Sequence, residues 1–240
     1  MMTFYTVLKL LDKYRMNPDQ TIVTVSKTAS CINGTSANLK EGDQFPVSEL
    51  VYGLMLPSGN DAAYSLAEYF GYKLATTKTH KINISEMTQQ AIVRMFIKEM
   101  NKNASKLKMT STQFDSAHGL MNKLNYSTAK DIVTMTLACM KIPRFRKVVN
   151  TKFYCTRAYN NPKSLYNWEN TNKLLGRKEH QLHWIGCKTG VTESAGPCFS
   201  GLYENNDTGD KYIIVVLGCK SMESRWVEVP KMVKWAIESK

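Results

Sequence analysis

The chain has 240 residues, of which 43% are hydrophobic and 22% charged, and 32 basic side chains against 20 acidic ones give a net charge of +12. This composition excludes a disordered chain, six cysteines are too few for a disulfide scaffold, and no apolar stretch approaches the length of a membrane span. The charge alone would favour a polyanionic partner, but 25 of the basic residues are lysines scattered from Lys9 to Lys240, which indicates a solvated surface and no nucleic-acid site.

Six segments have the hydrophobic periodicity of helices. They span residues 1–14, 46–52, 60–69, 84–101, 127–140 and 224–239. The first has apolar side chains at positions 1, 2, 4, 5, 7, 8, 10 and 11, which predicts a helix buried over most of its circumference. It does not have the pattern of a signal peptide, because Lys9, Asp12 and Lys13 interrupt the apolar stretch. In the fifth segment Ser127 is the predicted N-cap.

Four segments have the pattern of strands, at residues 21–25, 185–188, 198–203 and 211–219. The run 205–210 between the last two is rich in Asn, Asp and Gly, which predicts a turn. Residues 26–43 are rich in Gly, Ser, Asn and Thr and are predicted to form a loop. Helices come first, strands follow and a helix closes the chain, so the sequence predicts an α+β fold with an antiparallel sheet.

Several common chemistries have no motif here. The sequence contains neither of the common glycine-rich phosphate-binding loops, no C-x-x-C pair, no H-E-x-x-H and no G-x-S-x-G. His180 and His183 are three residues apart, but without further ligands they predict no zinc site, and we expect neither a metal nor a cofactor. Cys187 and Cys198 could face each other across neighbouring strands, although two separate buried thiols are the favoured interpretation.

Two tripeptides remain, Ser58-Gly59-Asn60 and Lys188-Thr189-Gly190. Each is weak alone: the first is compatible with an ordinary turn that caps a helix, and the second with a strand that ends at a turn glycine. In this order they match the S-D-N and K-T-G elements of penicillin-binding proteins and class A β-lactamases. Further matching words occur in order along the chain, YGLMLPSGNDAA at 52–63, HGL at 118–120, YSTAKD at 126–131, NTNKLLG at 170–176, CKTGVT at 187–192, AGPC at 195–198 and IIVVLG at 213–218.

These words together resemble the D-alanyl-D-alanine carboxypeptidase family, the low-molecular-mass penicillin-binding proteins of the serine β-lactamase-like superfamily. The resemblance implies one penicillin-recognising domain over residues 1–240, in which a helical subdomain covers about 40–150 and a sheet-bearing part covers about 1–30 and 151–240. It also implies a serine-type carboxypeptidase that acts through an acyl-enzyme on a D-Ala-D-Ala-like peptide terminus, or on a related acyl substrate with a terminal carboxylate.

The resemblance also assigns roles to both tripeptides. By that likeness the catalytic residues are Ser58, which relays a proton, Asn60, which hydrogen-bonds the substrate backbone, and Lys188, which supplies positive potential. Lys188 and Thr189 would bind the substrate carboxylate.

Two further substrate-binding residues follow them on the same strand. Gly190 would let the substrate lie close against the strand edge. The backbone N–H of Val191 would supply half of the oxyanion hole.

The departure from the family is the S-x-x-K motif, whose Ser is the nucleophile and whose Lys is the base. In the family this motif opens the buried helix, directly before an apolar-Met-Thr stretch. Here Met1-Met2-Thr3 stands in the place of that stretch, and the chain lacks the motif ahead of it. Ser26 and Lys27 do not replace it, because they are adjacent and follow a strand. We therefore expect no acyl-transfer activity from the 240-residue chain.

Two explanations of this departure stay open: a chain shortened at an internal methionine, or a pseudoenzyme that serves as a binding or structural subunit. The first is favoured because Ser58, Asn60 and Lys188 are all present. Relative to the family a strand pair of the central sheet would also be missing, so a natural short chain is expected to need a protein partner that completes the sheet.

The compartment is poorly constrained by the sequence. N-x-S/T sequons begin at Asn33, Asn83, Asn103, Asn125 and Asn206. About two or three are expected by chance at these residue frequencies, so the excess slightly favours a secreted protein.

Overall fold

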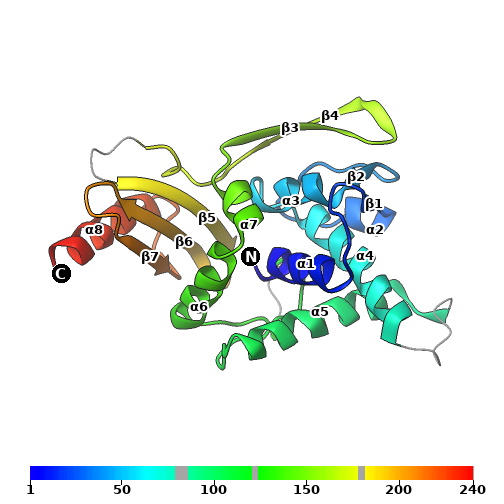
Figure 1. Cartoon of the computed structure of the whole chain (residues 1–240), viewed down its shortest axis with the longest axis horizontal. Helices are drawn as coiled ribbons and strands as arrows, with labels where there is room; N and C mark the ends of the chain where they lie inside the picture. The colour runs from blue at the N-terminus through cyan, green and yellow to red at the C-terminus, as the bar shows by residue number, and fades with distance from the viewer. Residues whose placement is uncertain (79–85, 121–123, 178–181, 240) are drawn as a thin grey trace.

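The computed structural model describes residues 1–78, 86–120, 124–177 and 182–239 (Figure 1). Its helices are α1 Met2–Lys13, α2 Lys27–Ser30, α3 Val47–Met55, α4 Asn60–Lys78, α5 Gln89–Lys106, α6 Ala129–Met140, α7 Pro143–Val149 and α8 Ser224–Glu238. Its strands are β1 Ile22–Thr24, β2 Gln44–Pro46, β3 Phe153–Ala158, β4 Asn161–Glu169, β5 Leu182–Thr192, β6 Gly196–Asn205 and β7 Lys211–Val216. All pairings among these strands are antiparallel, which confirms the predicted α+β class.

The largest sheet has the order β5-β6-β7. Successive side chains of a strand point to opposite faces, so Phe199 and Ser200 of β6 lie on different sides of this sheet. Phe199 packs against Trp226 of α8, with 5.5 Å between ring centroids, and Val229 and Val233 of the same helix are fully buried there. The closing helix therefore covers one face of the sheet, as Figure 1 shows.

The other face of the sheet lies against α6. The hydroxyls of Thr136 and Ser200 are 2.8 Å apart and both side chains are buried. This contact joins the sheet to the helices that precede it in the chain.

The predicted buried helix is confirmed as α1. Its residues from Met2 to Val7 are all buried, and it packs among α4 and α5 (Figure 1). Asn103 of α5 donates from Nδ2 to the hydroxyl of Thr6 at 3.0 Å, which satisfies both polar groups inside the helical part. Asn103 is only 5% exposed, so this predicted glycosylation site is inaccessible in the folded chain. Asn83, which begins another sequon, lies outside the described residues.

The β3–β4 hairpin lies over α3. Tyr154 stacks on Tyr52 with 3.8 Å between ring centroids, and Trp168 donates from Nε1 to the carbonyl of Ala37 at 2.9 Å. These contacts hold the hairpin and the loop after α2 around α3, whose carboxyl end leads into the turn at Ser58.

Several predicted boundaries were wrong in detail. Residues 26–43 contain α2, because the Ser26 hydroxyl accepts from the Ala29 N–H and caps a short helix. The N-cap of α6 is Thr128, whose hydroxyl accepts from Asp131 N–H at 3.2 Å, whereas the predicted cap Ser127 pairs its hydroxyl with Thr112.

The lengths of three helices also differ from the prediction. Helix α3 ends at Met55, α4 continues to Lys78, and α5 spans Gln89–Lys106, where 84–101 was predicted and 84–85 lie outside the described residues. Helix α7 and the strands β2, β3 and β4 were not predicted.

Candidate active site

Ser58 sits in the turn that joins α3 to α4. Its φ of +63° is left-handed, and its carbonyl accepts from the Thr35 hydroxyl at 2.6 Å. The next residue must be glycine, because a Cβ on Gly59 would lie 2.7 Å from the carbonyl oxygen of Gly53. The Gly59 N–H donates to that same carbonyl at 3.0 Å. The turn is therefore fixed by its own backbone, and Ser58 is half-buried at its apex.

Asn60 begins α4 and is 3% exposed. Its backbone N–H donates to Thr35 O at 2.8 Å and its Nδ2 donates to Asn33 O at 2.8 Å. A Cβ on Gly34 would lie 2.6 Å from Nδ2 of Asn60, so the loop before α3 packs directly on this amide. The same Cβ would lie 3.2 Å from Leu120, which brings the H-G-L segment to the same place.

Asp61 was not singled out in the sequence, yet it organises this wall of the site. The carboxylate is 1% exposed and accepts four hydrogen bonds, from the N–H groups of Ala37 (2.9 Å), Leu39 (3.0 Å) and Ala62 (2.9 Å) and from the Ser36 hydroxyl (2.6 Å). It therefore anchors the loop that covers Asn60. The signal in the sequence was an Asp in the first turn of a helix, which is common and points to no particular role.

Lys188 lies on β5 and is half-buried. Burial, and to a lesser degree the charge of Arg225, lower the pKa of its ammonium to about 7. Its Nζ donates to Thr189 O at 2.8 Å.

Arg225 of α8 is a second cation beside β5 that sequence reasoning missed. It is 3% exposed and donates from Nη1 to Cys198 O at 3.2 Å and to Gly190 O at 3.5 Å. Its pKa is lowered by burial. No motif marked this arginine, because it reaches the site from a helix more than thirty residues further along the chain.

Gly190 and Val191 are exposed on β5, which is an edge strand of the β5-β6-β7 sheet. Gly190 is paired with Cys198 of β6, and a Cβ on this glycine would meet nothing closer than the Cβ of Cys198 at 3.9 Å. Cys187 is paired with Gly201, so Cys187 and Cys198 do not face each other; both are free thiols, the first buried and the second half-buried.

Thr171 brings the two tripeptides together. Its backbone N–H donates to Leu56 O at 3.2 Å, two residues before Ser58. Its hydroxyl is 2.6 Å from the hydroxyl of Thr189. One residue of the N-T-N segment therefore contacts both the turn that holds Ser58 and the strand that holds Lys188.

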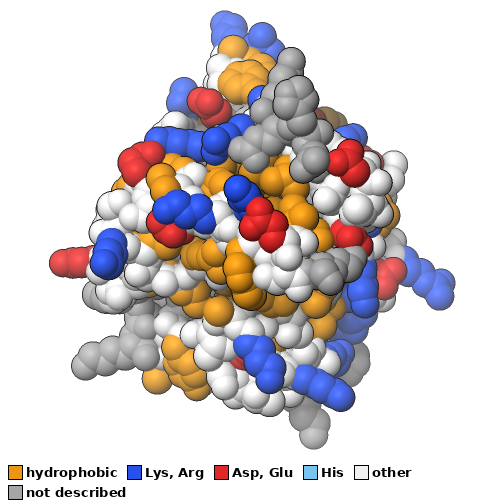
Figure 2. All heavy atoms as spheres, turned by 90° about the vertical axis from the view of Figure 1, so that its left-hand side faces the viewer, with side chains coloured by type: hydrophobic (Ala, Val, Ile, Leu, Met, Phe, Trp, Pro, Cys, Tyr) orange, Lys and Arg blue, Asp and Glu red, His pale blue; other side chains and the backbone are white. Residues whose placement is uncertain are grey.

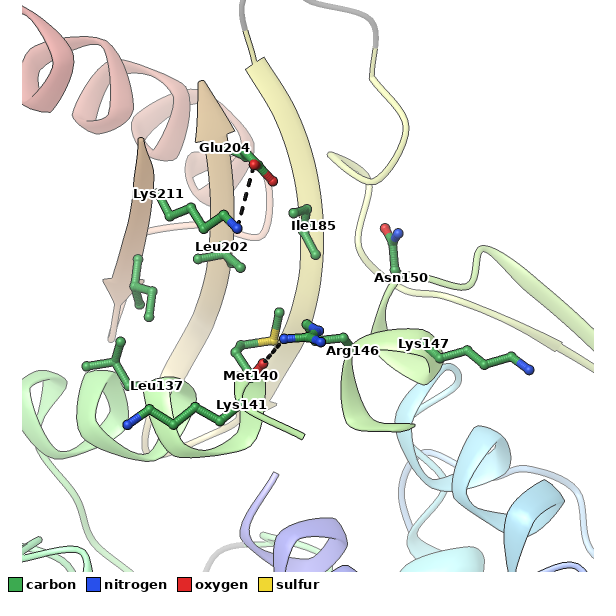
Figure 3. A pocket seen from close by; sticks show the side chains of 11 residues that line it. Leu137, Met140, Lys141, Arg146, Lys147, Asn150, Ile185, Leu202, Glu204 and Lys211 are labelled. Atoms are coloured by element: carbon green, nitrogen blue, oxygen red, sulfur yellow. Dashed lines mark hydrogen bonds and ion pairs between the residues drawn. The ribbon is translucent and has the colours of Figure 1, made fainter. Parts of the chain in front are cut away.

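A separate groove lies between α6, α7 and the sheet, with a cavity volume of about 640 Å³ (Figure 3). Its floor is the row Ile185, Leu202 and Ile213, which are paired across three strands. Figure 2 shows the side of the molecule on which α8 and β7 lie, with hydrophobic side chains across its middle and charged side chains of both signs among and around them. None of the predicted site residues lines this groove, so it is distinct from the site at Thr171.

Other kinds of site were also sought. Within the described ranges, no group of His, Cys, Asp and Glu is arranged to hold a metal ion; His183 is exposed and His180 lies outside those ranges. Across the same ranges no helix has the length and apolar character needed to cross a membrane.

Comparison with known proteins gives consistent matches. A family model described as D-alanyl-D-alanine carboxypeptidase matches residues 1–76 and 77–221. The D-alanyl-D-alanine carboxypeptidase of Streptomyces sp. (strain K15) is 34% identical over 204 residues, which cover 84% of this chain and 64% of the relative. DacD of Escherichia coli (strain K12), a D-alanyl-D-alanine carboxypeptidase, is 30% identical over 242 residues, which cover 98% and 54%. The chain thus spans between half and two thirds of the length of these relatives.

Solved structures match over nearly the whole chain. The crystal structure of the Streptomyces K15 DD-transpeptidase aligns with a TM-score of 0.82 and 33% identity, covering 99% of this chain and 86% of that one. Penicillin binding protein 6B from Escherichia coli aligns with a TM-score of 0.76 and 28% identity, covering 98% and 66%. The arrangement of helices and antiparallel sheet is therefore that of the penicillin-binding proteins.

Proposed function

The chain belongs to the D-alanyl-D-alanine carboxypeptidase family, and from this premise we propose that its cleft binds the carboxy terminus of a D-Ala-D-Ala-like peptide or a related acyl substrate. By the cleft we mean the proposed peptide site between the Ser58 turn and residues 188–191, whose two sides Thr171 joins through Leu56 and Thr189. The observation that carries the proposal is the Thr171 bridge, since it holds both tripeptides at one place although 130 residues separate them in the sequence.

The charge of the cleft supports a carboxylate as the group recognised. Lys188 and Arg225 are both partly withdrawn from water, and this desolvation lowers the pKa of each side chain because it disfavours the charged form. A bound carboxylate would favour the charged form of both side chains and so offset the desolvation. Thr189, next to Lys188, adds a hydroxyl that can donate to the same anion.

The shape of β5 supports an extended peptide as the rest of the ligand. Gly190 presents backbone without a side chain, and the space above it is open. A peptide can therefore lie along this edge with Asn60 and Ser58 opposite. In the proposed roles, Ser58 relays a proton and the Val191 N–H stabilises a developing oxyanion. The role of Asn60, to hold the peptide backbone, requires its Nδ2 to leave Asn33 O, because the side chain is 3% exposed and bonded there.

The acyl-transfer step needs a nucleophile and a base as well. The pattern S-x-x-K occurs twice in the chain. It spans Ser105–Lys108, where α5 ends, and Ser127–Lys130, where α6 begins. The Ser127 hydroxyl is 2.8 Å from that of Thr112, and neither pair opens α1. We infer that the 240 residues bind the peptide terminus without forming an acyl-enzyme, and that a chain with the motif directly ahead of Met1 would complete the reaction.

Binding is tested by calorimetry with a peptide that ends in D-Ala-D-Ala. We expect saturable binding that weakens by about tenfold or more when the terminal carboxylate is replaced by a carboxamide, because hydrogen bonds to charged groups contribute about 1.5–3 kcal/mol. Lys188→Met should reproduce this loss, whereas Lys173→Met, a control at an exposed lysine paired with Glu223, should not. Equal affinity for carboxylate and carboxamide would contradict the proposal.

Acyl transfer is tested by labelling with a fluorescent penicillin. The 240-residue chain is expected to stay unlabelled while a catalytically competent relative is labelled in the same experiment. A covalent, stoichiometric label on this chain would overturn the inference of inactivity. The transcript sequence directly 5′ of Met1 then separates the alternatives: an in-frame S-x-x-K favours the enzyme, and its absence favours a pseudoenzyme.

The pseudoenzyme alternative predicts that a protein partner completes the main sheet at an unpaired edge. Among the described strands β7 is paired on one side only, by β6, and its side chain Ile213 continues the apolar floor of the groove in Figure 3. An added strand from a protein partner would satisfy this edge. Sedimentation of the purified chain at high concentration tests self-association: a monomer throughout argues against a second copy as that partner.

A further inference from the structure

We propose that Thr171 is a positioning residue that fixes the hydroxyl of Thr189 and thereby sets the preference of the cleft for a carboxylate over a neutral peptide terminus. This inference rests on the proposed function, since it concerns how the same cleft recognises its ligand. Thr171 belongs to the NTNKLLG segment at 170–176, but the family likeness assigned no role to it.

The segment that carries Thr171 is held rigidly. Asn170 donates from its backbone N–H to Lys152 O at 2.8 Å and from Nδ2 to Thr151 O at 3.0 Å. The Asn170 side chain also accepts from the N–H of Asn172 at 3.0 Å. With its own N–H bound to Leu56 O, Thr171 has its backbone held on both sides, and its contact with Thr189 orients its hydroxyl.

The hydroxyls of Thr171 and Thr189 have one proton each, which limits the hydrogen bonds that the pair can donate. A threonine hydroxyl has one donor and two acceptor sites, so only one of Thr171 and Thr189 donates in their 2.6 Å contact. The Thr171 hydroxyl also has Leu56 O within reach, at 3.4 Å. When Thr171 donates to Leu56 O, the proton of Thr189 points to Thr171; when Thr171 donates to Thr189, the proton of Thr189 is directed to a third acceptor.

A bound carboxylate favours the arrangement in which Thr171 donates to Thr189 and the proton of Thr189 is free to point to the ligand. It accepts hydrogen bonds and donates none, so it needs the Thr189 proton directed toward it. The donation from Thr171 polarises the Thr189 hydroxyl and strengthens its bond to an anion. A carboxamide, which brings its own donors, gains less from this arrangement.

The test compares Thr171→Val with Thr171→Ser in the calorimetric experiment above. Thr171→Val removes the hydroxyl at nearly constant shape, and we expect it to weaken binding of the D-Ala-D-Ala carboxylate by about three- to tenfold, as for loss of one ordinary hydrogen bond. Binding of the carboxamide should change little, so the ratio of the two affinities falls. Thr171→Ser should restore the ratio, and Thr134→Val, which removes a hydroxyl bonded within α6, should leave it unchanged.

The outcomes separate this inference from the function on which it rests. If the unmodified chain binds neither peptide, the proposed function fails and this inference fails with it. If the unmodified chain discriminates between the peptides and Thr171→Val discriminates equally well, only the role of Thr171 is overturned. Equal weakening of both peptides would also overturn it, since that result indicates loss of structure in the cleft without loss of selectivity.

Discussion

For Lys188, folding favours the neutral side chain, whereas the proposed binding of a carboxylate favours the charged one. Folding removes its ammonium from water and lowers its pKa from 10.5 to about 7, with Arg225 as the second cause. Between these two values the unfolded chain binds more protons than the folded chain, so the free energy of unfolding should rise with pH in this window. Below pH 7 both states are protonated and the full cost of the buried charge is present.

This cost is measurable with Lys188→Met, which keeps an unbranched side chain of similar length. At pH 6 the variant should be more stable than the unmodified chain, and the difference should narrow as the pH rises toward 10. A shift of a single pKa unit corresponds to about 1.4 kcal/mol, so the change in the difference should exceed that value. Urea denaturation at several pH values checks this, and a difference that does not vary with pH would contradict it.

At the residue scale, the sequence predicted the motif residues of the candidate site but not the residues that hold them in place. Ser58, Asn60 and Lys188 belong to short words that can be recognised. Asp61, Thr171 and Arg225 act through backbone groups distant in the chain, such as Leu39, Leu56 and Gly190. Spacing in the sequence does not reveal such contacts, because they exist only once the loop before α3, the N-T-N segment and α8 are folded together.

At the element scale, the packing of α4 against α5 depends on Gly71. A Cβ at this position would lie 2.2 Å from the carbonyl oxygen of Ile92, so the two helices can cross here only without a side chain. Gly71→Ala should therefore destabilise the chain by about 1–3 kcal/mol, the usual cost of overpacking, in spite of the roughly 1 kcal/mol by which alanine favours a helix.

The control for this crossing is Tyr72→Ala, one residue further along α4, where the side chain is 52% exposed. Its effect on the midpoint of urea denaturation should be small. If Gly71→Ala proved as stable as the unmodified chain, the tight helix crossing would be wrong.

Helices with a strong apolar period were predictable and short elements were not. Helix α1 and helix α8 were placed to within one or two residues, because their buried faces repeat along the whole segment. The short helix α2 depends on a single side-chain cap at Ser26, and β2 has three residues that pair with β1. Hairpin β3–β4 carries polar residues at alternate positions, but its burial depends on α3, which its own sequence does not show.

At the scale of the whole molecule, the site lies where a helical part and a sheet meet. Asp61 fixes the helical wall, Arg225 and Lys188 provide the positive charge beside the sheet, and Thr171 joins the two walls. The net charge of +12 is spread over scattered lysines, so in the proposed function recognition depends on two desolvated cations and not on the surface charge.

The most direct test of the central claim is a titration of the ¹⁵N-labelled chain with a D-Ala-D-Ala peptide, followed by NMR. We predict that the largest amide shift changes occur at residues 58–60 and 188–191 and that they saturate together. Lys188→Met should shift their saturation to a peptide concentration about tenfold higher or more. Absence of saturable changes would contradict it, and so would changes centred on Leu137, Ile185 and Leu202, which line the groove of Figure 3.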